Sequence, residues 1–185
     1  TCQNLSLARV QKSLSIMGRE MGEGIDFGML LYPPLQVTDI FSLGVNLAHG
    51  GTDQRKAHVL MREVGNQVAG YKAVALHNHL ILGLGKPPAW PIDKDNLREI
   101  WTSLKMSKSK PETCIFIHDS VEDIRRKIAK AFCPPQETEF NPVLDWVKYL
   151  IFPIRGKLEI RREAQYGGNL SYQDFASLEK DYRQD

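Results

Sequence analysis

Apolar residues recur at intervals of three or four along the first part of the chain. This spacing predicts one face of an amphipathic helix that carries Leu7, Val10, Leu14, Met17 and Met21. Glycines in the segment 22–28 end that helix, and residues 29–43 predict a second one with Pro33 and Pro34 in its first turn, where missing amide donors do least harm. Because the first helix opens almost at residue 1 and no initial methionine is present, we expect the chain to be a fragment of a longer protein.

Two short apolar runs predict strands. Residues 45–48 end at Gly50-Gly51, after which we expect Thr52 to cap a helix whose inward face holds Ala57, Leu60 and Val64. Residues 71–82 predict another buried strand, so that strands and helices alternate. Such alternation is typical of an α/β fold with a parallel sheet, and these sheets bind ligands at the carboxyl ends of their strands.

The second half of the chain has a different pattern. Residues 83–103 form a long, proline-rich excursion, and the lysine-rich stretch LKMSKSKPE follows at 104–112. Ser120 can cap a further helix, whose apolar face would carry Val121, Ile124, Ile128 and Phe132. The remaining residues read as helical and more basic. We therefore predict two domains, residues 1–118 and residues 119–185.

The composition narrows the class of protein only a little. The 185 residues are 42% hydrophobic and 25% charged, which is ordinary for one globular domain or two small ones. The net charge of +2 neither indicates nor excludes a nucleic-acid binder. Three cysteines without a Cys-x-x-Cys pair argue against a disulfide framework or a zinc ribbon and fit a reducing, cytoplasmic compartment. No apolar run approaches the roughly 20 residues that cross a bilayer, so no membrane association is expected.

Two candidate ligand sites lie at predicted strand ends. Paired glycines such as Gly50-Gly51 let a ligand approach the backbone beside a helix N-terminus, although a tight turn explains the pair equally well. The lysine-serine segment within 104–112 is the second, and its alternative is a solvated basic loop.

A third candidate site is a helix face. Tyr32, Gln36 and Asp39 are spaced i, i+4 and i+7, which aligns a phenol, an amide and a carboxylate. A solvated polar face is the alternative. Because Tyr32 lies among apolar residues and precedes Pro33, we expect it to be buried. A ligand that carries an ammonium group and a hydroxyl group could then satisfy these polar side chains.

Taken in order, these segments resemble those of one enzyme family. Residues 105–109, KMSKS, match the signature loop of class I aminoacyl-tRNA synthetases, and we call them the KMSKS loop. The segments YPPLQVTDI, GGTDQRKAH, AFCPP and YGGNLSYQDFASLEKDY are similar to the tyrosyl-tRNA synthetases of archaeal and eukaryotic type. The resemblance implies the second half of a Rossmann-like, parallel-sheet catalytic domain, followed by a mainly α-helical anticodon-binding domain that is incomplete at its C-terminus. It also implies that the first half-sheet, with its His-Ile-Gly-His motif, precedes residue 1. His77-Asn78-His79 is not that motif, because it falls after the glycine turn and not before it.

The resemblance implies which residues bind ATP. Lys105 and Lys108 would be catalytic, because cations at the leaving phosphates stabilise the negative charge that develops as pyrophosphate departs. Ser107 and Ser109 would keep the loop compact and able to move, and Met106 would complete its contact with ATP. The ribose would meet Gly51 and Asp53, and the adenine would meet the backbone of Leu80 and Ile81.

The resemblance also implies a set of residues that bind tyrosine. Asp39 would accept a hydrogen bond from the substrate phenol, and the ammonium group would be contacted by Tyr32, Gln36 and Gln54. Phenylalanine would be rejected, because without its hydroxyl group Asp39 would stay buried and unpaired.

The C-terminal part carries basic and aromatic residues in alternation. Such a pattern suits single-stranded RNA, because cations contact phosphates and aromatic rings stack on bases. The alternative is a basic surface over an aromatic core. The residues are Lys148, Arg155, Lys157, Arg161 and Arg162 with Trp146, Tyr149, Tyr166 and Tyr172. By resemblance, Tyr166 would stack on an anticodon base.

Three departures from the family pattern stand out. Asn46 replaces a frequent aspartate, His79 replaces a usual proline, and residues 83–103 form a longer excursion than expected. His77 and His79 could also be read as metal ligands, but no third ligand follows at a suitable spacing, and we expect no structural metal. His49 and His58 are expected to be structural.

The function implied by the resemblance is ATP-dependent activation of tyrosine to tyrosyl-adenylate and its transfer to tRNA(Tyr). ATP with Mg²⁺, L-tyrosine and tRNA(Tyr) would be the partners of a cytoplasmic homodimer, and this chain alone would be an incomplete enzyme. Two alternatives remain. One is a non-catalytic RNA-binding or regulatory fragment. The other is a tryptophanyl-tRNA synthetase, which shares the fold and the loop, although Asp39 with Gln36 suits a phenol better.

Overall fold

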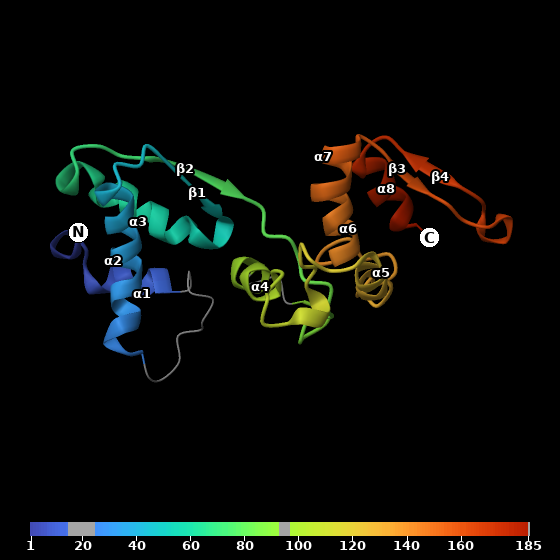
Figure 1. Ribbon diagram of the computed structural model, residues 1–185, viewed down its shortest axis with the longest axis horizontal. Coiled ribbons are helices and arrows are strands. Elements are labelled where there is room, and N and C mark those ends of the chain that lie inside the picture. The colour runs from blue at the N-terminus through green and yellow to red at the C-terminus, as the bar shows by residue number, and fades with distance from the viewer. Residues whose placement is uncertain (15–24, 93–96, 185) are drawn as a thin grey trace. The chain divides into compact units, whose positions relative to one another are not determined.

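The computed structural model describes residues 1–14, 25–92 and 97–184, which form two compact units, Thr1–Leu80 and Ile81–Asp185 (Figure 1). None of the helices in these ranges is long and apolar enough to cross a bilayer. Each unit has its own core, and each is described separately below.

The first unit contains a parallel strand pair joined by a helix. Strands β1 (Leu47–Gly51) and β2 (Val74–Asn78) pair in parallel from Leu47↔Val74 to Gly51↔Asn78. Helix α3 (Arg55–Val68) connects them and lies against the sheet, and α2 (Phe27–Ser42) packs on α3 (Figure 1). The predicted α/β fold with a parallel sheet is therefore confirmed.

Apolar residues of α2, β1 and α3, together with Ala73 directly before β2, form the core of the first unit. The cluster consists of Val37, Ile40, Ala48, Leu60, Met61, Val64 and Ala73. The inward face predicted for α3 is confirmed, since Ala57 is buried together with Leu60 and Val64. The other face of the sheet is exposed at Leu47, Val74 and Leu76, so the prediction that the strand within 71–82 is buried is wrong for β2, although parallel sheets are usually covered on both faces.

The first two helices begin where a side chain caps them. Ser6 accepts a hydrogen bond from the Arg9 amide at the start of α1 (Leu7–Ser13), which follows a short 3₁₀ turn, η1 (Cys2–Asn4). Asp26 accepts one from the Met29 amide at the start of α2. The predicted positions of Met17 and Met21 on the first helix lie outside the described residues.

The position of the two prolines differs from the prediction. Because Asp26 starts α2 at Phe27, two residues earlier than the apolar pattern indicated, Pro33 and Pro34 lie inside the helix and not in its first turn. Both are buried. A proline has no amide hydrogen, so the helical hydrogen bonds expected at these two positions are missing.

The predicted cap at Thr52 is also wrong. Strand β1 runs on through the glycines to Gly51, and Thr52 opens a 3₁₀ turn, η3 (Thr52–Gln54), without a capping hydrogen bond from a side chain. Helix α3 then starts at Arg55. The glycine turn is thus the end of the strand itself, which brings the backbone at Gly51 to the carboxyl edge of the sheet.

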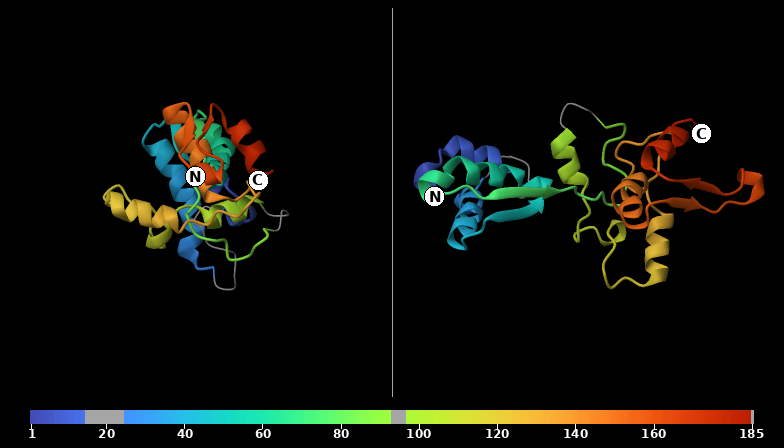
Figure 2. Two further views of the ribbon diagram at one scale, coloured as in Figure 1. Left: turned by 90° about the vertical axis from the view of Figure 1, so that its right-hand side faces the viewer. Right: turned by 90° about the horizontal axis from the view of Figure 1, so that it is seen from above.

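The second unit combines helices with an antiparallel hairpin. Its first elements are α4 (Leu97–Leu104), within the proline-rich excursion, the 3₁₀ turn η5 (Pro111–Thr113), and α5 (Val121–Ala129), which Ser120 caps as predicted. A continuous helical stretch follows, made of α6 (Pro142–Trp146), the π-helical turn η6 (Val147–Ile151) and α7 (Phe152–Arg155). Strands β3 (Leu158–Ile160) and β4 (Leu170–Tyr172) flank the 3₁₀ turn η7 (Ala164–Tyr166), and α8 (Phe175–Tyr182) ends the unit (Figures 1 and 2).

The predicted apolar face of α5 is wrong in part. Val121 is 57% exposed and Ile128 is also exposed, whereas Lys127 is buried at 5% exposure. Apolar periodicity failed here because Lys127 has partners for its charge: its ammonium group bonds the Cys114 carbonyl at 2.9 Å and the Asp119 carboxylate at 2.7 Å. A buried cation is tolerated when it is paired and hydrogen-bonded in this way.

Residues 81–118 pack with residues 119–185, so the compact units differ from the predicted domains 1–118 and 119–185. Hydrogen bonds link the two stretches: the Phe132 amide donates to the Leu84 carbonyl, and the Lys127 ammonium group donates to the Cys114 carbonyl. The rings of Trp101 and Phe140 lie 5.0 Å apart. The functional division into a catalytic and an anticodon-binding domain stays a prediction.

Candidate active site

In the first unit, Gln36 on α2 meets Gln54 on η3. The Gln36 amide nitrogen donates to the Gln54 side-chain oxygen at 3.1 Å. The other polar atom, Gln36 Oε1, is buried and has no hydrogen-bond partner among the described residues. A buried acceptor without a donor is costly. An ammonium group placed beside this pair would supply the missing donor.

Tyr32 and Asp39 share the α2 face with Gln36, but both are exposed. Tyr32 is 49% exposed, so the prediction that it is buried is wrong. The reason is that α2 turns Val37 and Ile40 toward the core, while the described residues leave the face with Tyr32 and Asp39 open. Both side chains are exposed with respect to the described residues of the first unit.

The carboxyl ends of the two strands converge at Gly51. A Cβ atom added to Gly51 would lie 2.6 Å from Asp53 Oδ1 and 2.6 Å from Leu80 Cδ2. Only a glycine fits this spacing without a shift of its neighbours. Three of the four residues expected to contact the ribose and the adenine, Gly51, Asp53 and Leu80, therefore lie together at the edge where parallel sheets bind ligands.

A histidine pair lies just below this edge. His58 Nδ1 and His77 Nε2 are 2.9 Å apart, and His58 is buried. Burial lowers the pKa of His58, and the neighbouring His77 lowers it further. The pKa of His77 is also lowered, first by burial and then by the charges of Arg55 and His49. His77 is thus engaged with His58, and His79 lies beyond the end of β2.

In the second unit, the KMSKS loop starts from a short backbone pairing. Lys105 forms an antiparallel bridge with Leu82, flanked by hydrogen bonds from the Met106 amide to the Ile81 carbonyl (2.7 Å) and from the Gly83 amide to the Leu104 carbonyl (2.9 Å). Ile81, expected to contact adenine, is therefore adjacent to the loop.

The turn of the loop is closed by its serines. The hydroxyl groups of Ser107 and Ser109 are 2.9 Å apart, and the Lys110 amide donates to the Ser107 carbonyl at 3.0 Å. Lys108 is exposed at the turn, and Lys105 is half-buried at its start. Lys108 therefore lies on a compact turn and Lys105 lies in the bridge at its start, and the role of the serines stays a prediction.

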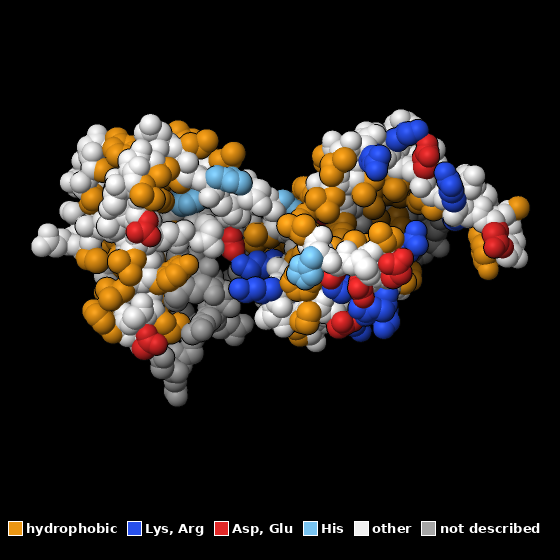
Figure 3. Space-filling model, viewed as in Figure 1, with side chains coloured by type: hydrophobic (Ala, Val, Ile, Leu, Met, Phe, Trp, Pro, Cys, Tyr) orange, Lys and Arg blue, Asp and Glu red, His pale blue; other side chains and the backbone are white. Residues whose placement is uncertain are grey.

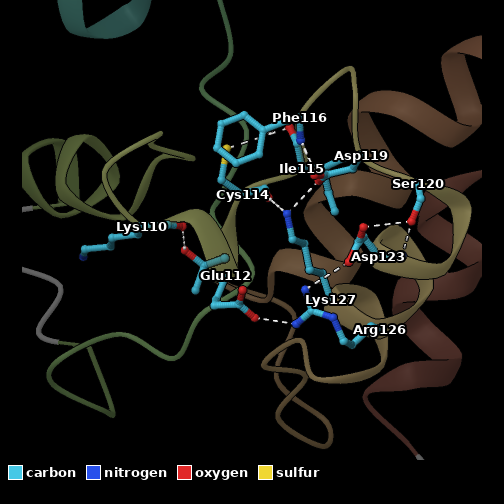
Figure 4. A network of polar contacts seen from close by, with 11 residues as sticks. Lys110, Glu112, Cys114, Ile115, Phe116, Asp119, Ser120, Asp123, Arg126 and Lys127 are labelled. Carbon is cyan, nitrogen blue, oxygen red and sulfur yellow. Dashed lines mark hydrogen bonds and ion pairs between the residues drawn. The ribbon is translucent and has the colours of Figure 1, made fainter.

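A polar network fixes the chain directly after the loop (Figure 4). Thr113 bonds the Lys110 carbonyl through both its amide and its hydroxyl group. Glu112 pairs with Arg126 of α5, which holds the pKa of Glu112 below its usual value. The hydrogen bond from Lys127 lowers the pKa of Asp119, and the bond from the Phe116 amide lowers it further.

The residues proposed for RNA contact separate into two groups. Tyr166 is 66% exposed in η7, at the tip of the β3–β4 hairpin, and Tyr149 is exposed beside Lys148. Figure 3 shows lysine and arginine side chains along this part of the unit, interspersed with acidic ones. Tyr172 belongs to the core with Leu144 and Leu178, so the alternative of a core aromatic holds for Tyr172.

Sequence reasoning missed two residues that contact the root of the loop. Asp145 and Trp146 of α6 bond the backbone of Leu82, 63 and 64 residues away along the chain. Trp146 was grouped with possible base-stacking rings, yet its indole donates inside the unit. No local pattern signals such a contact, because both partners sit in different elements.

Comparisons with known proteins identify the family. The family model described as tRNA synthetases class I (W and Y) matches residues 4–185. The tyrosine–tRNA ligase of Thermococcus kodakarensis is 49% identical over 97% of this chain and 51% of that protein, and that of Pyrococcus furiosus is 50% identical over the same shares. The chain thus spans about half the length of the curated relatives it matches.

A solved structure agrees with these relatives. The tyrosyl-tRNA synthetase of Pyrococcus horikoshii, crystallised with L-tyrosine, superposes with a TM-score of 0.87 at 48% identity, over 99% of this chain and 52% of that one. With a family model that covers nearly all of its residues, the chain belongs to the class I tRNA synthetases of the tryptophan and tyrosine group.

Proposed function

We propose that the protein to which this chain belongs is a tyrosine–tRNA ligase, which activates tyrosine with ATP and Mg²⁺ and transfers it to tRNA(Tyr). The observation that carries the proposal is the buried Gln36 Oε1 beside Gln54, which has no hydrogen-bond partner in the described part of the chain and lies on the helix face that also bears Tyr32 and Asp39. The identity of about half of all aligned positions to tyrosine–tRNA ligases supports the same choice of amino acid.

Tyrosine would bind along the α2 face. Its ammonium group would donate to Gln36 Oε1 and contact Tyr32 and Gln54, and its phenol would donate to Asp39. A bound substrate would itself cover these exposed groups. Phenylalanine lacks the hydroxyl group, so Asp39 would be desolvated without a donor, which is a strong form of discrimination.

ATP would bind at the edge marked by Gly51. The glycine lets the ribose approach the backbone next to Asp53, and Leu80 and Ile81 would offer backbone atoms to the adenine. An oxygen of the tyrosine carboxylate then attacks the α-phosphorus, and the bond to pyrophosphate breaks. Lys105 and Lys108 would stabilise the charge on the departing oxygens, which is where positioned cations lower the barrier most.

Transfer requires a tRNA partner. A ribose hydroxyl at the tRNA end attacks the activated carbonyl and releases AMP. The exposed Tyr166 at the hairpin tip, with basic residues such as Arg161 on the same hairpin, supports stacking on an anticodon base. The homodimer expected from the resemblance stays a prediction.

The test is amino-acid-dependent exchange of pyrophosphate into ATP by the full-length protein. We expect exchange with tyrosine and at least about 100-fold less with tryptophan or phenylalanine. Exchange that prefers tryptophan would replace the proposal with the other member of the family. No exchange with any of the three, in a protein that binds tRNA, would favour the non-catalytic alternative.

A further inference from the structure

Two consecutive side chains of α6 hold both backbone polar groups of Leu82, the residue that pairs with Lys105. We propose that Asp145 and Trp146 are positioning residues for the KMSKS loop, so that a helix of the C-terminal part determines where Lys105 stands during adenylate formation. The catalytic part of this inference rests on the proposed function of the loop.

The contact between α6 and Leu82 is short and buried. The Leu82 amide donates to Asp145 Oδ2 at 3.0 Å, and the Trp146 indole nitrogen donates to the Leu82 carbonyl at 2.8 Å. Leu82 is 2% exposed, and Asp145 is buried. Backbone groups at such depth need a partner, and here one helix supplies both. A bond from an amide to a carboxylate is also stronger than one between neutral groups.

Helix α6 is itself firmly capped. Asn141 is fully buried, and its side-chain oxygen accepts hydrogen bonds from the amides of Val143 and Leu144. Its side-chain nitrogen donates to the Glu137 carbonyl. The start of α6 therefore has a fixed direction, and Asp145 and Trp146 follow within its first turns.

The extended segment 81–83 connects α6 to the KMSKS loop. Successive residues of a strand direct their hydrogen-bonding groups to opposite edges. Ile81 and Gly83 bond the chain around Lys105, through Met106 and Leu104, whereas Leu82 between them bonds α6. The segment 81–83 thus lies between the loop on one edge and α6 on the other.

The turn η5 (Pro111–Thr113), which follows the loop, is bonded to the same segment. The Leu84 amide donates to the Thr113 carbonyl at 2.9 Å, and the Leu84 carbonyl accepts from the Phe132 amide at 2.8 Å. The start of the loop and the turn η5 that follows it are therefore both attached to residues 81–84. Because Asp145 and Trp146 of α6 hydrogen-bond to Leu82 within that stretch, loss of these hydrogen bonds should shift the loop as a whole.

The expected consequence lies in catalysis more than in substrate binding. Lys105 and Lys108 act on charge that develops in the transition state, so a small displacement lowers the rate of the chemical step. The tyrosine-binding residues belong to the first unit and make none of these hydrogen bonds. Tyrosine affinity should therefore remain unchanged.

The test compares substitutions in the full-length protein. Trp146→Phe keeps the ring and removes the indole donor, Asp145→Ala removes the acceptor, and Asp145→Asn retains an oxygen that can accept from the Leu82 amide. Trp90→Phe is the matched control, since the Trp90 ring packs on the Phe132 ring, whereas the hydrogen bonds from side chains to Leu82 in the described part of the chain come from Asp145 and Trp146. Single-turnover adenylate formation, tyrosine affinity and hydrogen exchange of the Met106 and Gly83 amides are measured for each.

We expect Trp146→Phe and Asp145→Ala to slow adenylate formation about tenfold, with faster exchange at both amides and unchanged tyrosine affinity. Asp145→Asn should recover most of the rate. If Lys105→Ala and Lys108→Ala are slow but Trp146→Phe matches Trp90→Phe in rate, the inference is overturned, whether or not amide exchange changes. Should Asp145→Ala fail to fold, Asp145→Asn and Trp146→Phe still decide the outcome.

The inference and the proposed function can fail separately. If Lys105→Ala and Lys108→Ala leave adenylate formation unchanged, the role proposed for the loop is lost. In that case, faster exchange at Met106 in Trp146→Phe would still support the positioning of the loop by α6, and unchanged exchange would overturn it. Slow lysine variants together with a normal Trp146→Phe rate would remove the positioning role alone.

Discussion

Tyr32 and Asp39 on α2 are exposed with respect to the described residues. In contrast, the backbone of residues 81–83 is hydrogen-bonded on one edge to the start of the KMSKS loop and on the other edge to α6. In the first unit, one buried acceptor, Gln36 Oε1, still has no donor among the described residues. In the second unit, both backbone groups of Leu82 have partners.

This difference separates two kinds of site. Groups that await a substrate are left open or unpaired, because the ligand itself provides the missing hydrogen bonds. Groups that act on a transition state need a fixed position before the reaction starts, so their support comes from the protein. Changes on the α2 face should therefore act on the choice of amino acid, and changes around the loop should act on rate or stability.

The largest effect is expected on the open face. Asp39→Ala should lower tyrosine-dependent pyrophosphate exchange at least about 100-fold, because the acceptor for the substrate phenol is lost. Asp181→Ala, an exposed acid on α8, is the matched control. Unchanged exchange in Asp39→Ala would remove this residue from the tyrosine site.

An intermediate effect, on stability, is expected from the buried Lys127, which bonds the chain that follows the KMSKS loop. Lys127→Met removes the ammonium group that donates to the Asp119 carboxylate and the Cys114 carbonyl, so the melting temperature of the protein should fall by about 5 °C or more. Lys130→Met, on the exposed side of the next turn, should change it much less. Equal melting temperatures for the two variants would contradict the structural role of Lys127.

The same pair has a predictable pH dependence. Because its partner holds the pKa of Asp119 below the usual value, the pair stabilises the fold above the ordinary carboxyl range. That stability is lost as the pH falls through the lowered pKa of the folded state. A thermal unfolding series in acid should therefore show a smaller loss for Lys127→Met than for the unaltered protein.

The smallest effect is expected at the histidine pair below Gly51. Both pKa values are lowered, so below about pH 6.5 the unfolded chain takes up protons before the folded one, and stability falls as the pH is lowered. His58→Gln should reduce the decrease in melting temperature between pH 7 and pH 5 by about 2 °C. His118→Gln, at an exposed position, serves as the control. If His58→Gln and the unaltered protein show the same pH dependence of the melting temperature, the predicted contribution of the histidine pair is contradicted.

Local patterns predicted the parts of the fold that depend on neighbours in sequence. The inward face of α3 followed from the spacing of Ala57, Leu60 and Val64, and the start of α5 followed from Ser120. The predicted start of α2 at residue 29 was wrong, because it followed the apolar pattern and did not take the capping residue Asp26 into account. Tertiary contacts decided the remainder.

Two cases show why those contacts escaped prediction. Lys127 reads as a surface residue until Asp119 and the Cys114 carbonyl are seen beside it. Trp146 reads as a ring for stacking until its indole nitrogen is found on Leu82, 64 residues earlier. The roles of Tyr32, Gln36, Asp39 and the loop lysines came from resemblance, and they stay predictions until the variants are measured.

The most direct measurement of the central claim is single-turnover adenylate formation in Lys105→Ala, Lys108→Ala and Lys110→Ala of the full-length protein. Lys105 and Lys108 lie in the KMSKS loop, whereas Lys110 lies just outside it and is exposed. We expect the first two to slow adenylate formation about 100-fold with little change in tyrosine affinity, and Lys110→Ala to remain close to the unaltered protein. Equal, small effects at all three positions would contradict the account and leave the segment 104–112 as a solvated basic loop.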